Sequence, residues 1–171
     1  MPLAESDSKS LEIRPAVRSD LPVIMSLIRE LAEYEQMEDQ VSADVATLEQ
    51  SLFGPVPSAR VILAWYGGIP VGSAVYFYNF STFIGRPGLY LEDLFVRPQY
   101  RKLGIGKALL LYLVDEALRL KCGRMEWSVL TWNQPAIDFY RSLGAVALEE
   151  WRIFRLSLAA MQALVRRSVP E

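Results

Sequence analysis

Two glycines at the start of a long apolar helix constrain this chain more than any other feature of its sequence. Gly104 and Gly106 lie in the stretch RKLGIGKALLLYLV, residues 101–114. Glycine costs about 1 kcal/mol relative to alanine inside a helix, so both residues must permit something that a side chain would block. A helix start presents unpaired N–H groups and the positive end of a dipole, so the turn is a candidate phosphate site.

The residues on either side of this turn predict a β–α–β unit. LYLEDLFV (89–96) has the composition of a strand and is followed by Pro98. The helix after the turn is expected to end near Cys122 and Gly123, where glycine is a natural cap. RMEWSVL (124–130) then has the composition of a second strand.

The rest of the chain adds elements before and after this unit. Strands are predicted at 11–14, 59–66, 71–80 and 151–157, and helices at about 20–35, 43–52, 133–144 and 161–167. Gly67 and Gly68 join two of the strands in a tight hairpin. We therefore expect an α/β (α+β) fold with a mixed, mostly antiparallel sheet flanked by helices. It would form a single domain over residues 11–171, after a solvated, disordered tail at 1–10.

The chain has no histidine, and this absence narrows the chemistry. Ser–His and Cys–His nucleophilic machinery is excluded, and the commonest ligand of a catalytic transition metal is missing, so we expect no metal. Acid–base chemistry must come from carboxylates, tyrosines or lysines.

Charge, hydropathy and cysteine content limit the partners and the compartment. The net charge of −2 argues against nucleic acid as the main partner, and no apolar run is long enough to span a membrane. The first ten residues lack the apolar core of a secretory signal. Cys122 is the single cysteine, which allows no internal disulfide and suits a reducing cytoplasm, where we expect the protein to work.

Two common phosphate-binding motifs do not fit the glycine turn. The nucleoside-triphosphate loop requires Ser or Thr after Gly106-Lys107, where this chain has Ala108. The dinucleotide fingerprint requires a third glycine or alanine at position 109, which is Leu109. The pattern that remains is Arg101-x-x-Gly104-x-Gly106, between a strand and a helix.

This pattern resembles the pyrophosphate loop of the Gcn5-related N-acetyltransferase (GNAT) superfamily, Gln/Arg-x-x-Gly-x-Gly/Ala. A second stretch is similar to the next signature of that family, because Asn133 precedes a short helix that carries Tyr140, before the turn Gly144-Ala145. The step from Asn133 to Tyr140 rotates about 700°, nearly two helical turns, so the two side chains face the same way. The resemblance covers residues 11–165 and implies the GNAT fold, with a β–α–β core that binds acetyl-CoA.

Further stretches are similar to the diamine acetyltransferase branch, which includes the spermidine/spermine and thialysine enzymes. They are Glu30–Glu35, Leu89–Asp93, Gly104–Gly106 and Trp132–Gln134. Polyamine-specific members have an acidic residue, proline and tryptophan before the Glu-Asp strand, where this chain has Ser81-Thr82-Phe83. The resemblance therefore implies a small primary amine, such as a diamine or a thialysine-like amino acid, ahead of a polyamine.

The resemblance also implies site residues and an assembly. The cofactor-binding residues would be Leu94, Phe95, Val96, Arg101, Lys102, Leu103, Gly104, Ile105, Gly106, Lys107, Asn133 and Tyr140. The substrate-binding residues would be Glu30, Glu33, Tyr34, Glu35, Phe83, Glu92 and Asp93. A backbone N–H near Leu94 would polarise the thioester carbonyl. Members of this branch are homodimers, so a homodimer is expected, and the strand at 151–157 would contribute to it.

The transfer of an acetyl group to an amine requires a general base and a general acid, and we expect one residue for each role. An alkylammonium has a pKa of about 10.4, so roughly one amine molecule in a thousand is neutral at pH 7 and a general base is needed. Glu92, on an otherwise apolar strand, is the candidate base, and Tyr140 is the candidate acid for the departing thiolate. Two alternatives stay open: an acetyl-CoA-binding module without turnover, and a protein-acetylating or regulatory domain.

Overall fold

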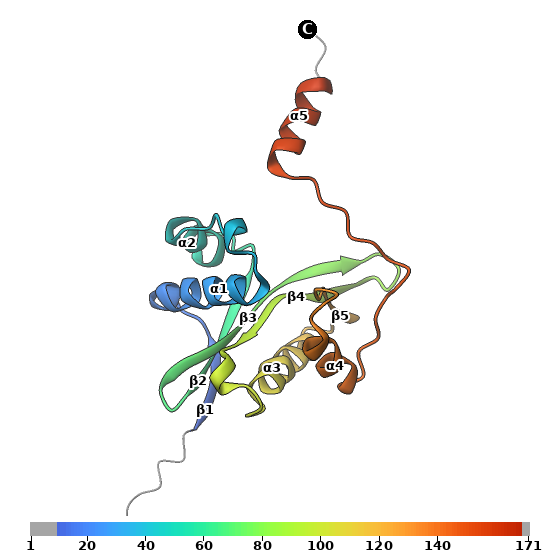
Figure 1. Cartoon of the computed structure of the whole chain (residues 1–171). Coiled ribbons are helices and arrows are strands. Elements are labelled where there is room, and N and C mark those ends of the chain that lie inside the picture. The colour runs from blue at the N-terminus through green and yellow to red at the C-terminus, as the bar shows by residue number, and fades with distance from the viewer. Residues whose placement is uncertain (1–9, 169–171) are drawn as a thin grey trace, which may run out of the picture. The chain divides into compact units, whose positions relative to one another are not determined.

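The computed structural model describes residues 10–168, which form two compact units that divide between Ser128 and Val129 (Figure 1). The tail predicted at 1–10 lies outside the described residues apart from Ser10. The Ser10 carbonyl accepts a hydrogen bond from the N–H of Gly67 at 3.1 Å. The single domain expected over 11–171 stays a prediction.

A five-stranded sheet forms the centre of the first unit. Its strands, which pair in sequence order, are β1 (Leu11–Pro15), β2 (Arg60–Tyr66), β3 (Ile69–Ser81), β4 (Arg86–Val96) and β5 (Arg124–Trp127). The pairs from β1 to β4 are antiparallel, and β4 pairs with β5 in parallel. A parallel pair requires a crossover, which a helix between β4 and β5 supplies. The predicted mixed, mostly antiparallel sheet and its β–α–β unit are confirmed.

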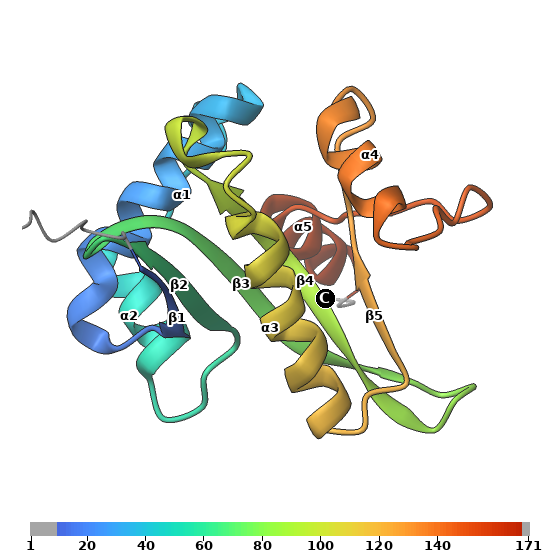
Figure 2. The same cartoon turned by 90° about the horizontal axis from the view of Figure 1, so that it is seen from below.

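Helices of the first unit cover both faces of this sheet. The helices are α1 (Leu21–Glu35), α2 (Val45–Phe53) and α3 (Ile105–Arg119) in the first unit, and α4 (Gln134–Ser142) and α5 (Leu158–Ser168) in the second. In the first unit α1 and α2 lie on one face of the sheet and α3 on the other (Figure 2). Ile24 and Leu27 of α1 are buried against Leu63 and Phe95 of the sheet. Each such side chain contributes about 1.5–3 kcal/mol when it leaves water, and this packing holds α1 on the sheet.

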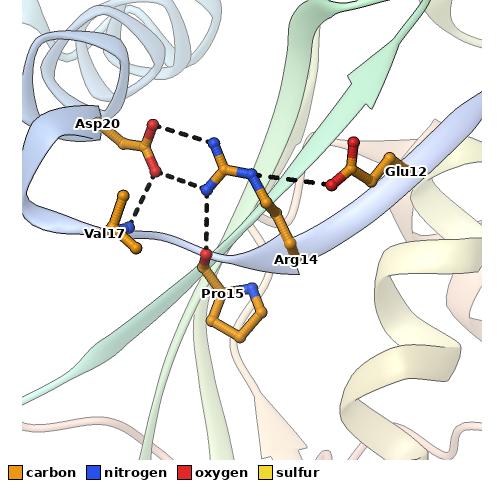
Figure 3. Close-up of polar contacts among 5 residues, drawn as sticks. All are labelled: Glu12, Arg14, Pro15, Val17 and Asp20. Carbon is orange, nitrogen blue, oxygen red and sulfur yellow. Dashed lines mark hydrogen bonds and ion pairs between the residues drawn. The ribbon is translucent and has the colours of Figure 1, made fainter.

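The connection from β1 to α1 is fixed by a buried carboxylate (Figure 3). Arg14 donates two hydrogen bonds to the carboxylate of Asp20, at 2.7 and 3.1 Å, and the Val17 N–H donates a third at 2.9 Å. These donors favour the ionised form, so the pKa of Asp20 lies below its usual range. The Arg14 guanidinium also stacks on Trp65, 4.9 Å from the ring centroid, which joins β1 to β2.

The hairpin between β2 and β3 is confirmed, and the end of α3 differs from the prediction. Gly67 and Gly68 have φ angles of 58° and 75°, the left-handed conformation that a two-residue hairpin requires. At the end of α3 the left-handed residue is Lys121, with φ 57°, so the helix stops before the predicted cap at Gly123. The Lys121 and Cys122 N–H groups bond back to the carbonyls of the last turn and close the helix without glycine.

The strand predicted at 151–157 is wrong. These residues lie in neither a helix nor a strand, between α4 and the closing helix α5, which is confirmed. Trp151, Ile153 and Phe154 are between 72% and 92% exposed. A strand needs a neighbour for its backbone hydrogen bonds, and no described strand pairs with this stretch, so its apolar composition alone does not produce one.

Candidate active site

Strand β4 carries a β-bulge at Glu92. In the ladder with β3, Val75 lies opposite Asp93 and Tyr76 lies opposite Leu91, so Glu92 is the extra residue. A bulge re-aims side chains and shifts the alternation of the strand by one position. The predicted general base therefore lies at the irregular point of the strand, and its side chain is exposed.

The same bulge ends the pairing between β4 and β5. The last residue pair of that parallel ladder is Leu91 with Trp127, immediately before Glu92. Strand β5 is therefore shorter than the predicted 124–130. Beyond Glu92, the edge of β4 that pointed at β5 has no strand partner among the described residues. On this stretch the Val96 carbonyl accepts a hydrogen bond from Arg101 Nε at 3.0 Å.

Three carboxylates gather between the bulge and the end of α1. Asp93 lies two residues before Phe95, and therefore on the strand face that packs against α1. Burial, followed by the negative charges of Glu92 and Glu35, raises the pKa of Asp93 to about 6. Burial also raises the pKa of Glu35, the last residue of α1. No ion pair between described residues neutralises these three groups.

The two glycines of the turn differ in how far the structure requires them. Gly104 precedes α3 with a φ angle of 78°, a left-handed conformation that the backbone of the turn demands. Gly106 lies within the helix, and a Cβ added there would meet no atom closer than Val96 Cγ2 at 3.8 Å. The packing of the protein does not require glycine at 106. Its absent side chain leaves the first N–H groups of α3, which no side chain caps, open to a ligand.

Three of the predicted site residues, Glu30, Tyr34 and Arg101, have interaction partners within the first unit. Both Glu30 oxygens accept hydrogen bonds from Arg97, at 2.7 and 2.8 Å, which lowers the pKa of Glu30. The Arg101 guanidinium lies over the Tyr34 ring. Sequence reasoning missed Arg97, although Arg97 and Arg101 have the same four-residue spacing as Glu30 and Tyr34.

The other predicted residues of the first unit differ mainly in exposure. The exposed ones are Glu33, Phe83, Lys102, Leu103, Gly104 and Lys107; Leu94 and Val96 are half-buried, and Phe95 and Ile105 are buried. Phe83, at the β3–β4 hairpin, is 99% exposed. Lys102 and Lys107 place two cations beside the glycine turn, where they favour a phosphate.

Asn133 and Tyr140 belong to the second unit. Asn133 is buried and caps α4, because its side-chain oxygen accepts a hydrogen bond from the Ala136 N–H at 3.4 Å. Tyr140 is half-buried in the last part of that helix, with its ring tilted against Phe139 at a centroid distance of 5.2 Å. The predicted short helix is confirmed as α4, with Tyr140 inside it and Asn133 as the N-cap just before it. That the two side chains face the same way stays a prediction.

Neither a metal centre nor a membrane span was found in the described part of the chain. Within residues 10–168, no group of three or more His, Cys, Asp or Glu side chains is placed to hold a metal ion. No helix within the same range is both long and apolar enough to cross a bilayer.

A bulged strand, a glycine turn and the start of a helix follow one another from β4 to α3. The chain belongs to the acetyltransferase (GNAT) family, whose model matches residues 24–145. It is an acetyl-CoA-dependent N-acetyltransferase with the GNAT fold, as predicted from the sequence.

The matched proteins agree with this family. The chain is 38% identical over 163 residues to a thialysine N-epsilon-acetyltransferase of Bos taurus, covering 89% of this chain and 95% of that protein. It is 40% identical over 101 residues to an L-ornithine N5-acetyltransferase of Arabidopsis thaliana, covering 59% and 44%. Among solved structures, an integron cassette protein from the mobile metagenome of V. cholerae matches with a TM-score of 0.77 and 27% identity, covering 92% and 98%.

The carboxylate cluster predicts a pH-dependent stability. Because the pKa of Asp93 is raised in the folded protein, its contribution to stability is complete below about pH 4 and is lost as the pH rises through about 6. We predict that Asp93→Asn raises the melting temperature by about 3 °C at about pH 8 and by much less at about pH 4.5. Thermal melts across this range measure the difference.

Asp39→Asn is the matched control, since Asp39 is an exposed carboxylate. Its melting temperature should follow that of the wild type at every pH. If Asp93→Asn also runs parallel to the wild type, Asp93 does not carry the raised pKa.

Proposed function

We propose that the protein transfers the acetyl group of acetyl-CoA to a primary amine of a small cationic acceptor. The observation that carries this proposal is the un-neutralised cluster of Glu35, Glu92 and Asp93 at the bulge of β4. An ammonium group compensates buried carboxylates, so the cluster favours a cation over a neutral or anionic acceptor. The similarity to thialysine and ornithine acetyltransferases supports a diamine or a thialysine-like amino acid, ahead of a polyamine.

Acceptor binding would involve more than this cluster. We assign Glu33, Tyr34 and Phe83 to the acceptor side, as the family resemblance implies. Glu30 belongs to the same acidic segment, but its charge is already paired with Arg97, so its part in acceptor binding would be indirect. The four remaining carboxylates, Glu33, Glu35, Glu92 and Asp93, would supply the electrostatic attraction.

Acetyl-CoA would bind through the turn 101–107. The N–H groups around Gly104 and Gly106 would hold the pyrophosphate, while Lys102 and Lys107 supply positive charge and Leu103 and Ile105 complete the turn. The half-buried end of β4, Leu94 to Val96, would run beside the pantetheine arm, and Asn133 would contact that arm from α4. The unpaired edge of β4 beyond the bulge supplies the backbone donors that this arrangement needs.

Catalysis would join these two halves. Glu92 takes the proton of the ammonium, directly or through water, and the neutral nitrogen attacks the thioester carbonyl carbon. The developing oxyanion accepts a hydrogen bond from a backbone N–H near Leu94. The new C–N bond forms, the C–S bond breaks, and the phenol of Tyr140 gives its proton to the departing thiolate. The products are the N-acetyl amine and free CoA.

The assembly and the compartment follow from the resemblance and the composition. We propose a homodimer, the form that the diamine acetyltransferase branch implies. We also propose that it works in the cytoplasm, which suits a chain whose only cysteine is Cys122. The partners would be the amine and a second copy of this chain, without nucleic acid, membrane or metal.

Gly106→Val tests the assignment of the turn. A Cβ at position 106 meets only Val96 Cγ2, at 3.8 Å. The valine side chain would occupy the proposed path of the pyrophosphate, so the affinity for acetyl-CoA should fall at least about tenfold. Calorimetry measures the affinity, and thermal melts should show a stable protein. The affinity of Gly106→Ala for acetyl-CoA should lie between those of the wild type and Gly106→Val, because alanine has a smaller side chain than valine. A folded valine variant with wild-type affinity would remove the turn from the binding site.

Glu92→Gln tests the general base. Without the base, the reaction depends on free amine, whose fraction rises about tenfold per pH unit below the pKa of the ammonium. We expect kcat/KM to fall about 100-fold near neutral pH and less as the pH rises. Thiol release from acetyl-CoA across a panel of amines gives the rates. Glu126→Gln is the matched control, because it makes the same change on β5, and it should retain wild-type rates. If Glu92→Gln also retains the wild-type rate at neutral pH, Glu92 is not the general base.

Tyr140→Phe tests the general acid. Removal of the phenol should lower turnover by about 100-fold and leave the calorimetric affinity for acetyl-CoA unchanged. Tyr90→Phe is a matched control, because it also removes one hydroxyl, which bonds to Ser128 Oγ at 2.9 Å. If Tyr140→Phe turns over at the wild-type rate, Tyr140 is not the general acid.

A further inference from the structure

One face of α1 carries three residues that meet two arginines beside the glycine turn. Ser26, Glu30 and Tyr34 follow one another at intervals of four, so they form a single stripe along the helix. Arg97 and Arg101, also four residues apart, flank the short turn Pro98–Tyr100 between β4 and the glycines. The stripe and the arginines therefore connect α1 to the segment that would bind acetyl-CoA.

Arg97 is the fixed end of this connection. Its guanidinium donates to both oxygens of Glu30, to the Pro70 carbonyl at 2.7 Å and to Ser26 Oγ at 3.4 Å. Ser26 in turn donates to Glu30 at 2.7 Å. The arginine thus joins α1, the start of β3 and the end of β4, and its side chain is only 21% exposed.

Arg101 is the end nearer the glycines. Its Nε donates to the Val96 carbonyl at 3.0 Å, and its guanidinium lies 4.3 Å from the centroid of Tyr34 and 5.9 Å from that of Phe95. The charged group is therefore turned towards α1. The next residues, Lys102 to Gly104, are exposed.

We propose that the side chains of Arg101 and Tyr34 act as one positioning pair, which holds the acetyl-CoA turn at a fixed place relative to the acidic end of α1. This inference rests on the proposed function. The backbone of the turn would contact the pyrophosphate, and the Arg101 side chain would act on the reaction only through the position of that backbone. Glu35 is the neighbour of Tyr34, so the same pair fixes the distance between the acyl donor and the acceptor carboxylates.

The physical consequence concerns turnover more than affinity. A stack of this kind is a modest interaction, which keeps the turn in place without being needed for folding. A misplacement of about 1 Å between reacting groups costs up to about 100-fold in rate, whereas a mobile turn can still wrap a pyrophosphate. Loosening the pair should therefore lower kcat and leave the KM for acetyl-CoA nearly unchanged.

A double-mutant cycle with Arg101→Lys and Tyr34→Leu tests this pair. Arg101→Lys keeps the charge but loses the planar group, and Tyr34→Leu removes the ring. Each variant should lower kcat about tenfold with less than about a threefold change in KM for acetyl-CoA, and the double variant should be no worse than either single one. Arg60→Lys removes a matched stack on Tyr78, at 5.3 Å, and should keep the wild-type kcat.

Hydrogen exchange of residues 97–107 gives a second readout that does not depend on turnover. Both single variants should exchange faster in this segment than the wild type and the Arg60 variant. Unchanged exchange in both variants would overturn the positioning pair. So would additive kinetic effects, a rise in the KM for acetyl-CoA in Arg101→Lys alone, or a rise in the KM for the amine in Tyr34→Leu alone. A wild type that releases no thiol with any amine overturns the proposed function instead, while the exchange comparison still decides on the pair.

Discussion

The single extra residue in β4 determines the geometry of the site in the first unit. Before Glu92, β4 has a strand on each side; after it, the pairing with β5 has ended and the pairing with β3 continues. An exposed carboxylate at Glu92, a half-buried one at Asp93 and a strand edge without a strand partner among the described residues therefore lie within a few residues of the bulge.

Electrostatics then divide the acidic residues of α1 into two groups. Glu30 has its charge neutralised by Arg97, which lowers the pKa of Glu30, whereas burial raises the pKa of Glu35 without a cation beside it. A run of acidic residues in a sequence therefore does not act as a unit. Glu35 lies near Asp93 and has no ion-pair partner among the described residues, whereas Glu30 meets Arg97 and helps to hold α1 on the sheet.

Most elements of the fold were predictable because their signals are local. The helical spacing of apolar residues predicts α1, and the adjacent glycines predict the β2–β3 hairpin. The glycine turn between a strand and a helix predicts the β–α–β unit. The bulge at Glu92 was not predictable, since it exists only in the register between β3 and β4. The missing strand at 151–157 has the same cause, because a strand depends on a partner that the local sequence does not specify. The stripe on α1 was visible as a four-residue spacing, but its arginine partners are about seventy residues away in the chain.

The stripe on α1 also limits how this protein can change its length. Inserting or deleting one residue between Ser26 and Tyr34 would rotate one end of the stripe by about 100° relative to the other, so that Arg97 and Arg101 could no longer both find their partners. A difference of three or four residues would nearly restore the face but would shift the acidic end of the helix by about one turn along its axis, about 5 Å. Homologous enzymes are therefore expected to differ in the length of the connection from α2 to β2, whereas the number of residues between Ser26 and Tyr34 stays constant.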